Sequence, residues 1–347
     1  MSVVVSHGWN LVPPAGRKLI EGYLVLPAYF GVELFFVLSG FLIGSILLKE
    51  KHTSSFTALR KFWIRRWFRT LPNYYLVILL TLLADIVLGH TEELHRRDLL
   101  DLLFLQNFAW AHSRFYGISW SLAVEEWFYL LFPLGVLLLR KWKFPFGIAF
   151  VGVTVLFILG PTLARIVASQ IRPDLFFDAH YWKIVVFRLD AVMYGVLAAW
   201  LKQVFPQGWS AQHFGLLFLS FLILCGVTTC FVLGRQLPAI VFNILICPLT
   251  SLGFALSLPF FDRLDRKPFG PFAGLIGRVA LYSYSIYLIH PIICDGLEYL
   301  TVKYTPGFAI CYALVGVLVI LSYLVSKALF HLYEKPMMDL RERYSHG

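Results

Sequence analysis

The chain has 347 residues, of which 59% are hydrophobic, 17% aromatic and only 14% charged. Soluble globular domains carry about 25% charged and 45–50% apolar residues, so this composition excludes a soluble domain and indicates an integral membrane protein. The net charge of +10 does not indicate nucleic-acid binding, because the basic residues form short runs between apolar stretches, as juxtamembrane charges do.

The chain begins with an apolar run that ends in a histidine, "MSVVVSHGWN". The segment "VVVSH" is typical of the last two turns of an apolar helix, and the beginning of that helix would lie before Met1. We therefore expect a truncated first membrane span with His7 at its end.

Nine further stretches are long and apolar enough to cross a bilayer as helices, which takes about 20 residues. They are residues 30–48, 71–89, 118–139, 145–164, 183–201, 213–233, 238–259, 279–296 and 307–330. Residues 98–112 ("DLLDLLFLQNFAWAH") are apolar but short and contain Gln106 and Asn107, which favours a half-helix or re-entrant segment. The sequence thus predicts an all-α polytopic membrane helix bundle, nine full spans plus the truncated one, forming a single domain over residues 1–347.

The connections between the spans differ in their content of lysine and arginine. Segments 49–69, 140–144, 202–212, 260–278 and 331–347 together hold 18 basic residues, and the alternating connections hold 9. Cytoplasmic connections are the more basic ones, so we expect the C-terminus in the cytoplasm. A span that starts in the cytoplasm and ends at His7 would then place this histidine towards the outer side of the membrane.

All five cysteines fall inside apolar stretches of the sequence. They are Cys225, Cys230, Cys247, Cys294 and Cys311. Their spacing fits neither a metal site nor a disulfide framework, so we expect core packing and predict no metal ligands.

Charged and polar side chains inside a bilayer are costly, so each needs a partner or a function. In "GVELFFVLSGFLIG", Glu33 lies near the outer end of a span, and Ser39 and Gly40 lie about two turns deeper. Small residues in membrane helices usually indicate close helix packing, which is the structural alternative for Ser39 and Gly40.

A cluster of arginines follows in "RKFWIRRWFRTLP". Arg66 and Arg69 are three residues apart and share one helix face, with Arg65 beside them. The cluster is either an ordinary cytoplasmic anchor or a phosphate-binding site, because guanidinium groups match the geometry of phosphate oxygens.

The stretch "ISWSLAVEEWFYLLFP" carries Ser121, Glu125 and Tyr129 at intervals of four residues, so they form one stripe on a helix. Glu125 and Glu126 lie at the outer end of this span with no basic residue beside them in the sequence. A functional role for at least one of these carboxylates is favoured over a structural role for both.

Two later spans also carry polar residues. Arg188 and Asp190 in "FRLDAVMYG" are only two residues apart, so we expect their partners on other helices. His290 in "YSYSIYLIHP" is a lone histidine in an apolar span, where a hydrogen-bonded packing residue is the more common case. We therefore expect a structural role for His290.

Six segments, taken in order, resemble the acyltransferase 3 family of integral membrane O-acyltransferases. They are "GVELFFVLSGFLIG", "RRWFRTLPNYY", "WSLAVEEWFYLLFP", "FRLDAVMYG", "YSYSIYLIHP" and "FHLYEKPMMDL", and the resemblance covers nearly the whole chain. In that family the first membrane helix ends in a histidine shortly before the span that resembles the first of these segments. His7 occupies this place, so the resemblance implies that it is the catalytic histidine.

The resemblance also implies a mechanism. Acyl-CoA, most often acetyl-CoA, would arrive from the cytoplasm as a co-substrate rather than a bound cofactor, and Arg66 and Arg69, supported by Arg65, would hold its phosphates. His7 would act as a general base on an acceptor hydroxyl, or as the nucleophile of an acyl-histidine relay. Glu125 would orient His7 and stabilise its imidazolium, as the carboxylate does in a Ser-His-Asp triad.

The acceptor end of the site is expected to hold aromatic and hydroxyl groups, which suit sugar rings. The residues expected to shape it are Glu33, Ser39, Trp120, Ser121, Arg188 and Asp190. The acceptor would be a cell-envelope carbohydrate or another glycoside, and the sequence does not choose among these.

A secondary transporter of a small polar or anionic solute is the alternative, because about ten helices and buried charges also suit that class. Transporter folds often contain repeats with matching broken helices, and the sequence shows no such pair. We therefore expect a multi-pass enzyme of the inner (plasma) membrane whose partners are acyl-CoA, a carbohydrate or glycoside acceptor and membrane lipid.

Overall fold

Regular structure in this computed structural model is helical throughout the residues that it describes, which are 1–13, 21–49, 55–88, 95–111, 115–172, 178–233, 238, 240–264, 270 and 272–345. The expectation of an all-α chain is confirmed. Residues 89, 112 and 239, which belong to expected segments, lie outside the described residues, as do parts of the connections used to predict the orientation.

Seven helical stretches in the described part of the chain are long and apolar enough to cross a membrane. They are α3 (Glu21–Lys49), α4 (Phe56–Leu88), α5 (Ser119–Lys141), α6 (Phe146–Ile171), α9 (His213–Leu233), α10 (Cys247–Arg263) with the preceding π-helical turn (Val241–Ile246), and α12 (Phe308–Leu329) with the following π-helical turn (Phe330–Glu334) and α13 (Lys335–Ser345). The chain is a multi-pass membrane protein, as expected.

Two of the nine expected spans, 183–201 and 279–296, are helical but are not among these seven. They fall in α7 (Val185–Val204) and α11 (Ala273–Tyr304). Charged side chains in α7, and charged and histidine side chains in α11, make these helices less apolar than the others.

The remaining elements are short. They are α1 (Ser2–Gly8) with the 3-10 turn that follows it (Trp9–Leu11), the 3-10 helix η3 (Arg96–Leu103), the π-helical turn η4 (Asp178–Trp182) and α8 (Pro206–Ala211). Residues 98–111 therefore form less than a span: they contain most of the eight-residue η3 and then continue in turns.

The chain divides into two compact units, each assembled from separate segments. Unit 1 comprises Met1–Gly31, Ile64–Leu94 and Asp265–Gly347, and unit 2 comprises Val32–Trp63 and His95–Leu264. The expectation of a single domain stays a prediction.

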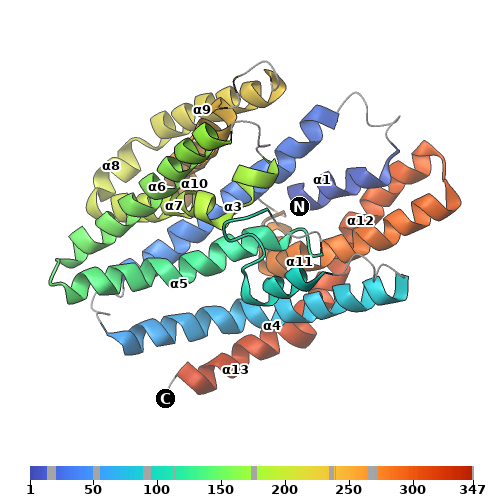
Figure 1. The fold of residues 1–347 in the computed structure, drawn as a ribbon, viewed down its shortest axis with the longest axis horizontal. Coiled ribbons are helices and arrows are strands. Elements are labelled where there is room, and N and C mark those ends of the chain that lie inside the picture. The colour runs from blue at the N-terminus through green and yellow to red at the C-terminus, as the bar shows by residue number, and fades with distance from the viewer. Residues whose placement is uncertain are drawn as a thin grey trace. The chain divides into compact units, whose positions relative to one another are not determined.

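In unit 1, α11 and α12 pack along each other, and the short helix α1 contacts both (Figure 1). Apolar side chains from these helices and the turns next to them form a buried cluster, whose members are Val4, Leu11, Tyr282, Ile286, Cys294, Leu297, Leu318 and Phe330. Burial of such side chains fixes α1 against the two long helices.

In unit 2, α10 packs along α9 and α7, and α6 packs along α7 and α5 (Figure 1). The backbones of α3 and α7 approach each other closely at two glycines. A Cβ atom on Gly40 would lie 1.9 Å from the carbonyl oxygen of Val192, and one on Gly195 would lie 1.9 Å from that of Val37. The close-packing alternative is thus confirmed for Gly40.

Candidate active site

His7 lies in the last turn of α1, and its side chain is partly exposed. The backbone carbonyl of His7 accepts a hydrogen bond from Sγ of Cys294 in α11 over 3.6 Å. Trp9, two residues later, packs edge-on against Tyr312 of α12 with 5.8 Å between the ring centroids. The expectation that "VVVSH" ends a helix is confirmed, and contacts to α11 and α12 hold that end in place.

A second histidine lies against His7. His290 of α11 is fully buried, and its Nε2 atom lies 3.1 Å from Nδ1 of His7, with the two ring centroids 5.0 Å apart. On its other side, Nδ1 of His290 lies 2.7 Å from the carbonyl oxygen of Tyr287 and 3.1 Å from that of Ile286. His290 is a hydrogen-bonded core residue, as expected, but the sequence did not reveal that its partner is His7.

The arginine cluster lies on α4. The side chains of Arg65 and Arg69 are exposed, and that of Arg66 is partly exposed. Directly after them, the backbone carbonyl of Thr70 accepts a hydrogen bond from the hydroxyl of Tyr284 in α11 over 2.7 Å. The three guanidinium groups therefore belong to a stretch of α4 that is tied to the helix carrying the second histidine.

A buried polar cluster next to these arginines was not predicted. Glu334, in the π-helical turn after α12, accepts hydrogen bonds from Nδ2 of Asn73 over 2.8 Å and from the hydroxyl of Ser285. Asn73 lies one turn beyond Arg69 on α4, and the guanidinium of Arg69 attracts the Glu334 carboxylate. Glu334 stands in "FHLYEKPMMDL", but only the fold brings it to Asn73 and Ser285.

Helix α11 links the two clusters of unit 1. Ser285 and His290 are five residues apart, which corresponds to about 7.5 Å along the axis of an α-helix. The polar cluster beside the arginines and the histidine pair are therefore held at a defined separation by one rigid element.

In unit 2, the carboxylate of Glu125 is buried and hydrogen bonded. Its Oε1 atom accepts from the hydroxyl of Tyr129 over 2.7 Å and from the hydroxyl of Ser39 in α3. The expected stripe on α5 thus brings Glu125 and Tyr129 together, whereas the hydroxyl of Ser121 donates to the carbonyl of Ile118 over 3.3 Å. Ser39 contributes a hydrogen bond and not packing alone.

Four buried charged side chains form two ion pairs in unit 2. Arg188 of α7 donates to Glu33 of α3 over 2.5 Å, and Arg165 of α6 donates to Asp190 of α7 over 2.7 Å. The hydroxyl of Ser251 also donates to Glu33 over 3.0 Å. The expectation that Arg188 and Asp190 find their main partners on other helices is confirmed, although Nη1 of Arg188 and Oδ1 of Asp190 are still only 4.0 Å apart.

Trp120 is buried in an aromatic cluster close to the Glu33 pair. Its ring centroid lies 5.9 Å from that of Phe36 and 4.9 Å from that of Trp182. The indole N–H of Trp182 in turn donates to Glu33 over 3.1 Å. Trp120 therefore packs beside the buried charges, and its role at an acceptor site stays a prediction.

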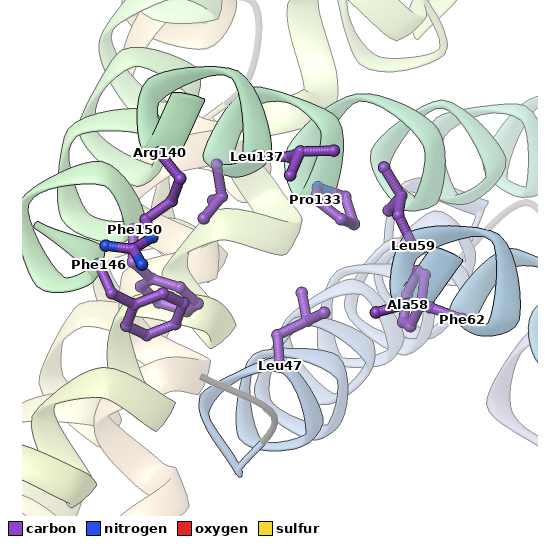
Figure 2. A pocket seen from close by; sticks show the side chains of 10 residues that line it. Leu47, Ala58, Leu59, Phe62, Pro133, Leu137, Arg140, Phe146 and Phe150 are labelled. Carbon is purple, nitrogen blue, oxygen red and sulfur yellow. The ribbon is translucent and has the colours of Figure 1, made fainter. Parts of the chain in front are cut away.

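A small apolar cavity of about 30 Å³ lies in unit 2, where α3 and α5 end and α4 and α6 begin. Figure 2 shows the guanidinium of Arg140 beside Phe146 and Phe150, with Leu47 and Leu59 lining other parts of the cavity. None of the site residues expected from the sequence lines this cavity.

The expected site residues fall into two sets. His7, Arg65, Arg66 and Arg69 belong to unit 1, and Glu33, Ser39, Trp120, Ser121, Glu125, Arg188 and Asp190 belong to unit 2. Within the second set, contacts join Glu33 with Arg188 and Ser39 with Glu125. The pairing of His7 with Glu125 stays a prediction.

Comparison with known proteins places these residues in a family. The model of a family described as "Acyltransferase domain" matches residues 1–326. The chain belongs to this acyltransferase family. The matched residues include the contacting histidines His7 and His290, the arginine cluster and the buried ion pairs.

Curated relatives of this acyltransferase are bacterial O-acetyltransferases by name, and two of the three described below are named for peptidoglycan. It is 35% identical over 128 residues to a peptidoglycan O-acetyltransferase of Listeria monocytogenes, an alignment that covers 33% of this chain and 20% of the relative. It is 40% identical over 120 residues to a putative peptidoglycan O-acetyltransferase of Bacillus subtilis, covering 30% and 19%. A putative O-acetyltransferase of Staphylococcus aureus is 33% identical over 143 residues, covering 37% and 24%. The chain thus spans a quarter or less of the length of these relatives, and no solved structure matches it.

Proposed function

We propose that this acyltransferase moves an acetyl group from acetyl-CoA to a hydroxyl group of a cell-envelope carbohydrate, with peptidoglycan as the acceptor class. Family membership supports acyl transfer, and the names of the Listeria and Bacillus relatives support O-acetylation of peptidoglycan. Acetyl-CoA acts as a co-substrate, and the enzyme works in the plasma membrane with its C-terminus in the cytoplasm.

The observation that carries the proposal is that one unit contains both a partly exposed histidine and a cluster of exposed and partly exposed arginines. His7 offers a ring that substrates can reach, while its contact with a buried histidine limits how that ring turns. Arg65, Arg66 and Arg69 offer guanidinium groups on a helix tied to α11. General-base chemistry and phosphate recognition are the two functions that transfer from acyl-CoA requires.

The arginine cluster binds the donor. Coenzyme A carries several phosphate charges, and planar guanidinium groups bind phosphate oxygens through paired hydrogen bonds. Arg66 and Arg69 share one face of α4, so they contact one phosphorylated ligand together, and Arg65 adds charge beside them.

His7 is the general base. A neutral imidazole is suited to proton transfer near neutral pH. Glu125 is the carboxylate that stabilises the imidazolium once it forms, with its own position set by Ser39 and Tyr129. Glu33, Trp120, Ser121, Arg188 and Asp190 shape the acceptor end of the site.

The proposal is tested with purified protein in lipid vesicles, acetyl-CoA labelled in its acetyl group, and peptidoglycan fragments. We expect thiol release and labelled fragments in equal amounts. Thiol release without label on any carbohydrate would contradict the acceptor class, and the absence of both would contradict the donor.

Replacement of Arg66 or Arg69 by alanine tests donor binding. Each lost charge-assisted contact is worth about 1.5–3 kcal/mol, so KM for acetyl-CoA is expected to rise about ten- to a hundredfold while KM for the acceptor stays unchanged. Arg278→Ala is the control, because Arg278 is an exposed arginine of unit 1 that bonds to its own helix. An unchanged KM for acetyl-CoA in both cluster variants would contradict donor binding. The cluster would then only anchor the cytoplasmic end of α4 at the membrane surface.

A further inference from the structure

We propose that His290 is a positioning residue that sets the tautomer of His7, so that Nε2 of His7 carries the lone pair that takes up the proton. The role of this nitrogen as a base rests on the proposed function, whereas the tautomer of the neutral ring follows from the hydrogen-bond geometry and the burial of His290.

The first step concerns Nδ1 of His290. This atom lies 2.7 Å from the carbonyl oxygen of Tyr287 and 3.1 Å from that of Ile286. A carbonyl oxygen only accepts hydrogen bonds, so Nδ1 of His290 must carry the hydrogen. In a neutral imidazole the other nitrogen, Nε2, then has a lone pair and accepts.

The second step concerns the charge of His290. Its side chain is 0% exposed, and the buried apolar cluster of unit 1 includes Ile286 and Cys294 of the same helix, each one turn away. A charged imidazolium in such a place would lose its hydration, which is costly. His290 is therefore neutral, and its Nε2 atom is an acceptor.

The third step transfers this constraint to His7. Nδ1 of His7 lies 3.1 Å from Nε2 of His290. Since the buried nitrogen accepts, Nδ1 of His7 carries the hydrogen and donates it. When the ring of His7 is neutral, its lone pair is then on Nε2. His7 is also the more exposed ring of the pair.

This arrangement fits the chemistry of acyl transfer. The acceptor hydroxyl attacks the thioester carbonyl while its O–H bond breaks and its proton moves to Nε2 of His7. As the C–S bond breaks, the thiolate of coenzyme A leaves with the electron pair and takes the proton back from the imidazolium. The Nδ1–H of His7 stays hydrogen bonded to His290 throughout, so the ring does not turn between the two transfers.

The inference changes the expected division of roles. In a Ser-His-Asp triad the carboxylate both holds the tautomer and stabilises the imidazolium. Here His290 holds the tautomer through Nδ1 of His7, and Glu125 keeps only the electrostatic role proposed above.

Nitrogen NMR of protein with ¹⁵N-labelled histidine rings tests the tautomer directly, because protonated and lone-pair nitrogens have different chemical shifts. The His7 signals are assigned by their loss in His7→Ala. We expect Nδ1 of His7 to be protonated and Nε2 to be unprotonated in the wild-type protein. The opposite pattern in the wild-type protein would overturn the inference.

Substitutions of His290 test its effect on the reaction. Glutamine places a polar group near the position of Nε2 and can accept from His7, whereas asparagine reaches only the position of Nδ1. We expect kcat to fall about 10²–10⁴-fold in His290→Ala and His290→Asn, the range for loss of a well-placed general base, with KM for acetyl-CoA unchanged. His290→Gln should recover at least a tenth of the wild-type kcat, since about tenfold corresponds to one modest hydrogen-bond difference.

Leu288→Ala is the control for packing, because Leu288 is a fully buried residue of the same helix. It should lower stability without lowering kcat per folded molecule. Equal activities of the glutamine, asparagine and alanine variants would reduce His290 to a packing residue and overturn the inference. Failure of the wild-type protein to transfer acetyl would instead contradict the proposed function, while the NMR result would still decide the tautomer.

Discussion

Four of the charged side chains buried in unit 2 are compensated by a partner of opposite charge. Glu33 is paired with Arg188 and Asp190 with Arg165, and the exposed fraction of all four side chains is 1% or less. Charges removed from water are costly, and the cost is recovered only when geometry and hydrogen bonding are good. The loss of one partner is therefore more damaging than the loss of both.

Replacement of Asp190 by asparagine is expected to destabilise the protein by about 3–5 kcal/mol, because it leaves the buried Arg165 without its counter-charge. Thermal unfolding in detergent measures the effect. The control is Asp262→Asn, which breaks the partly exposed pair of Asp262 with Lys202 and should cost less than about 1 kcal/mol. Equal losses in both variants would mean that burial of the pair is irrelevant to stability.

Replacement of Glu125 by glutamine separates its charge from its hydrogen bonds. Glutamine keeps an oxygen that can accept from Ser39 and Tyr129 but carries no charge, so kcat should fall about ten- to a hundredfold if the carboxylate stabilises an imidazolium. Acetyl transfer at equal protein levels in membranes measures this. Tyr129→Phe is the matched variant, which removes a hydrogen bond and keeps the charge. A larger loss in Tyr129→Phe than in Glu125→Gln would contradict the electrostatic role.

Individual residues could be predicted from the sequence only where local pattern was enough. The position of His7 at a helix end and the need of Arg188 and Asp190 for distant partners follow from spacing and from the cost of buried charge. The contact of His7 with His290 joins residues 283 positions apart, and no periodicity reports such a contact. From the sequence alone, a single histidine in an apolar helix, such as His290, is therefore interpreted as a packing residue. Only the fold shows that a second histidine ring lies against it.

At the scale of elements, two glycines, one in α3 and one in α7, allow the backbones of these helices to come into contact. Gly40→Ala or Gly195→Ala would place a methyl group 1.9 Å from a carbonyl oxygen, so the helices would have to separate. We expect a loss of at least about 1–3 kcal/mol, the usual cost of overpacking, measured by thermal unfolding in detergent.

Gly160→Ala provides the control for this prediction. Gly160 lies in α6, and nothing lies within 4 Å of a Cβ atom built on it. Alanine favours a helix over glycine by about 1 kcal/mol, so this variant should be neutral or slightly stabilising. If Gly160→Ala were as unstable as Gly40→Ala, the close approach of α3 and α7 would not be the cause of the destabilisation.

Helices could be predicted well from apolar length, and their ends less well. All nine expected spans are helical where described, apart from one or two residues at the start of some of them, because a backbone in lipid must satisfy its own hydrogen bonds. α11 runs from Ala273 to Tyr304, well beyond the expected 279–296, because Arg278 at one end and Glu298 and Lys303 at the other interrupt the apolar run without ending the helix. The π-helical turn that carries Glu334 depends on tertiary packing and has no signal in the sequence.

At the scale of the whole molecule, the excess of basic residues in alternate connections predicts the orientation. A fluorescent protein fused to the C-terminus should fold and fluoresce, and alkaline phosphatase fused at the same place should be inactive, because cytoplasmic connections are the basic ones. Active phosphatase without fluorescence would show that the C-terminus lies outside the cytoplasm. The arginine cluster would then lie on the side of the membrane without coenzyme A.

The most direct test of the proposed function is the rate of acetyl transfer by His7→Ala. The variant should insert and fold, since His7 lies at a helix end and is partly exposed. His213→Ala is the control. His213 is a partly exposed histidine of unit 2 at the start of α9, and its Nδ1 atom lies 2.7 Å from the carbonyl oxygen of Ser210. With labelled acetyl-CoA and equal protein levels in membranes, transfer by His7→Ala should fall about 10²–10⁴-fold while His213→Ala stays near wild type. Transfer by His7→Ala at a rate close to that of the wild-type protein would contradict the assignment of His7 as the catalytic base.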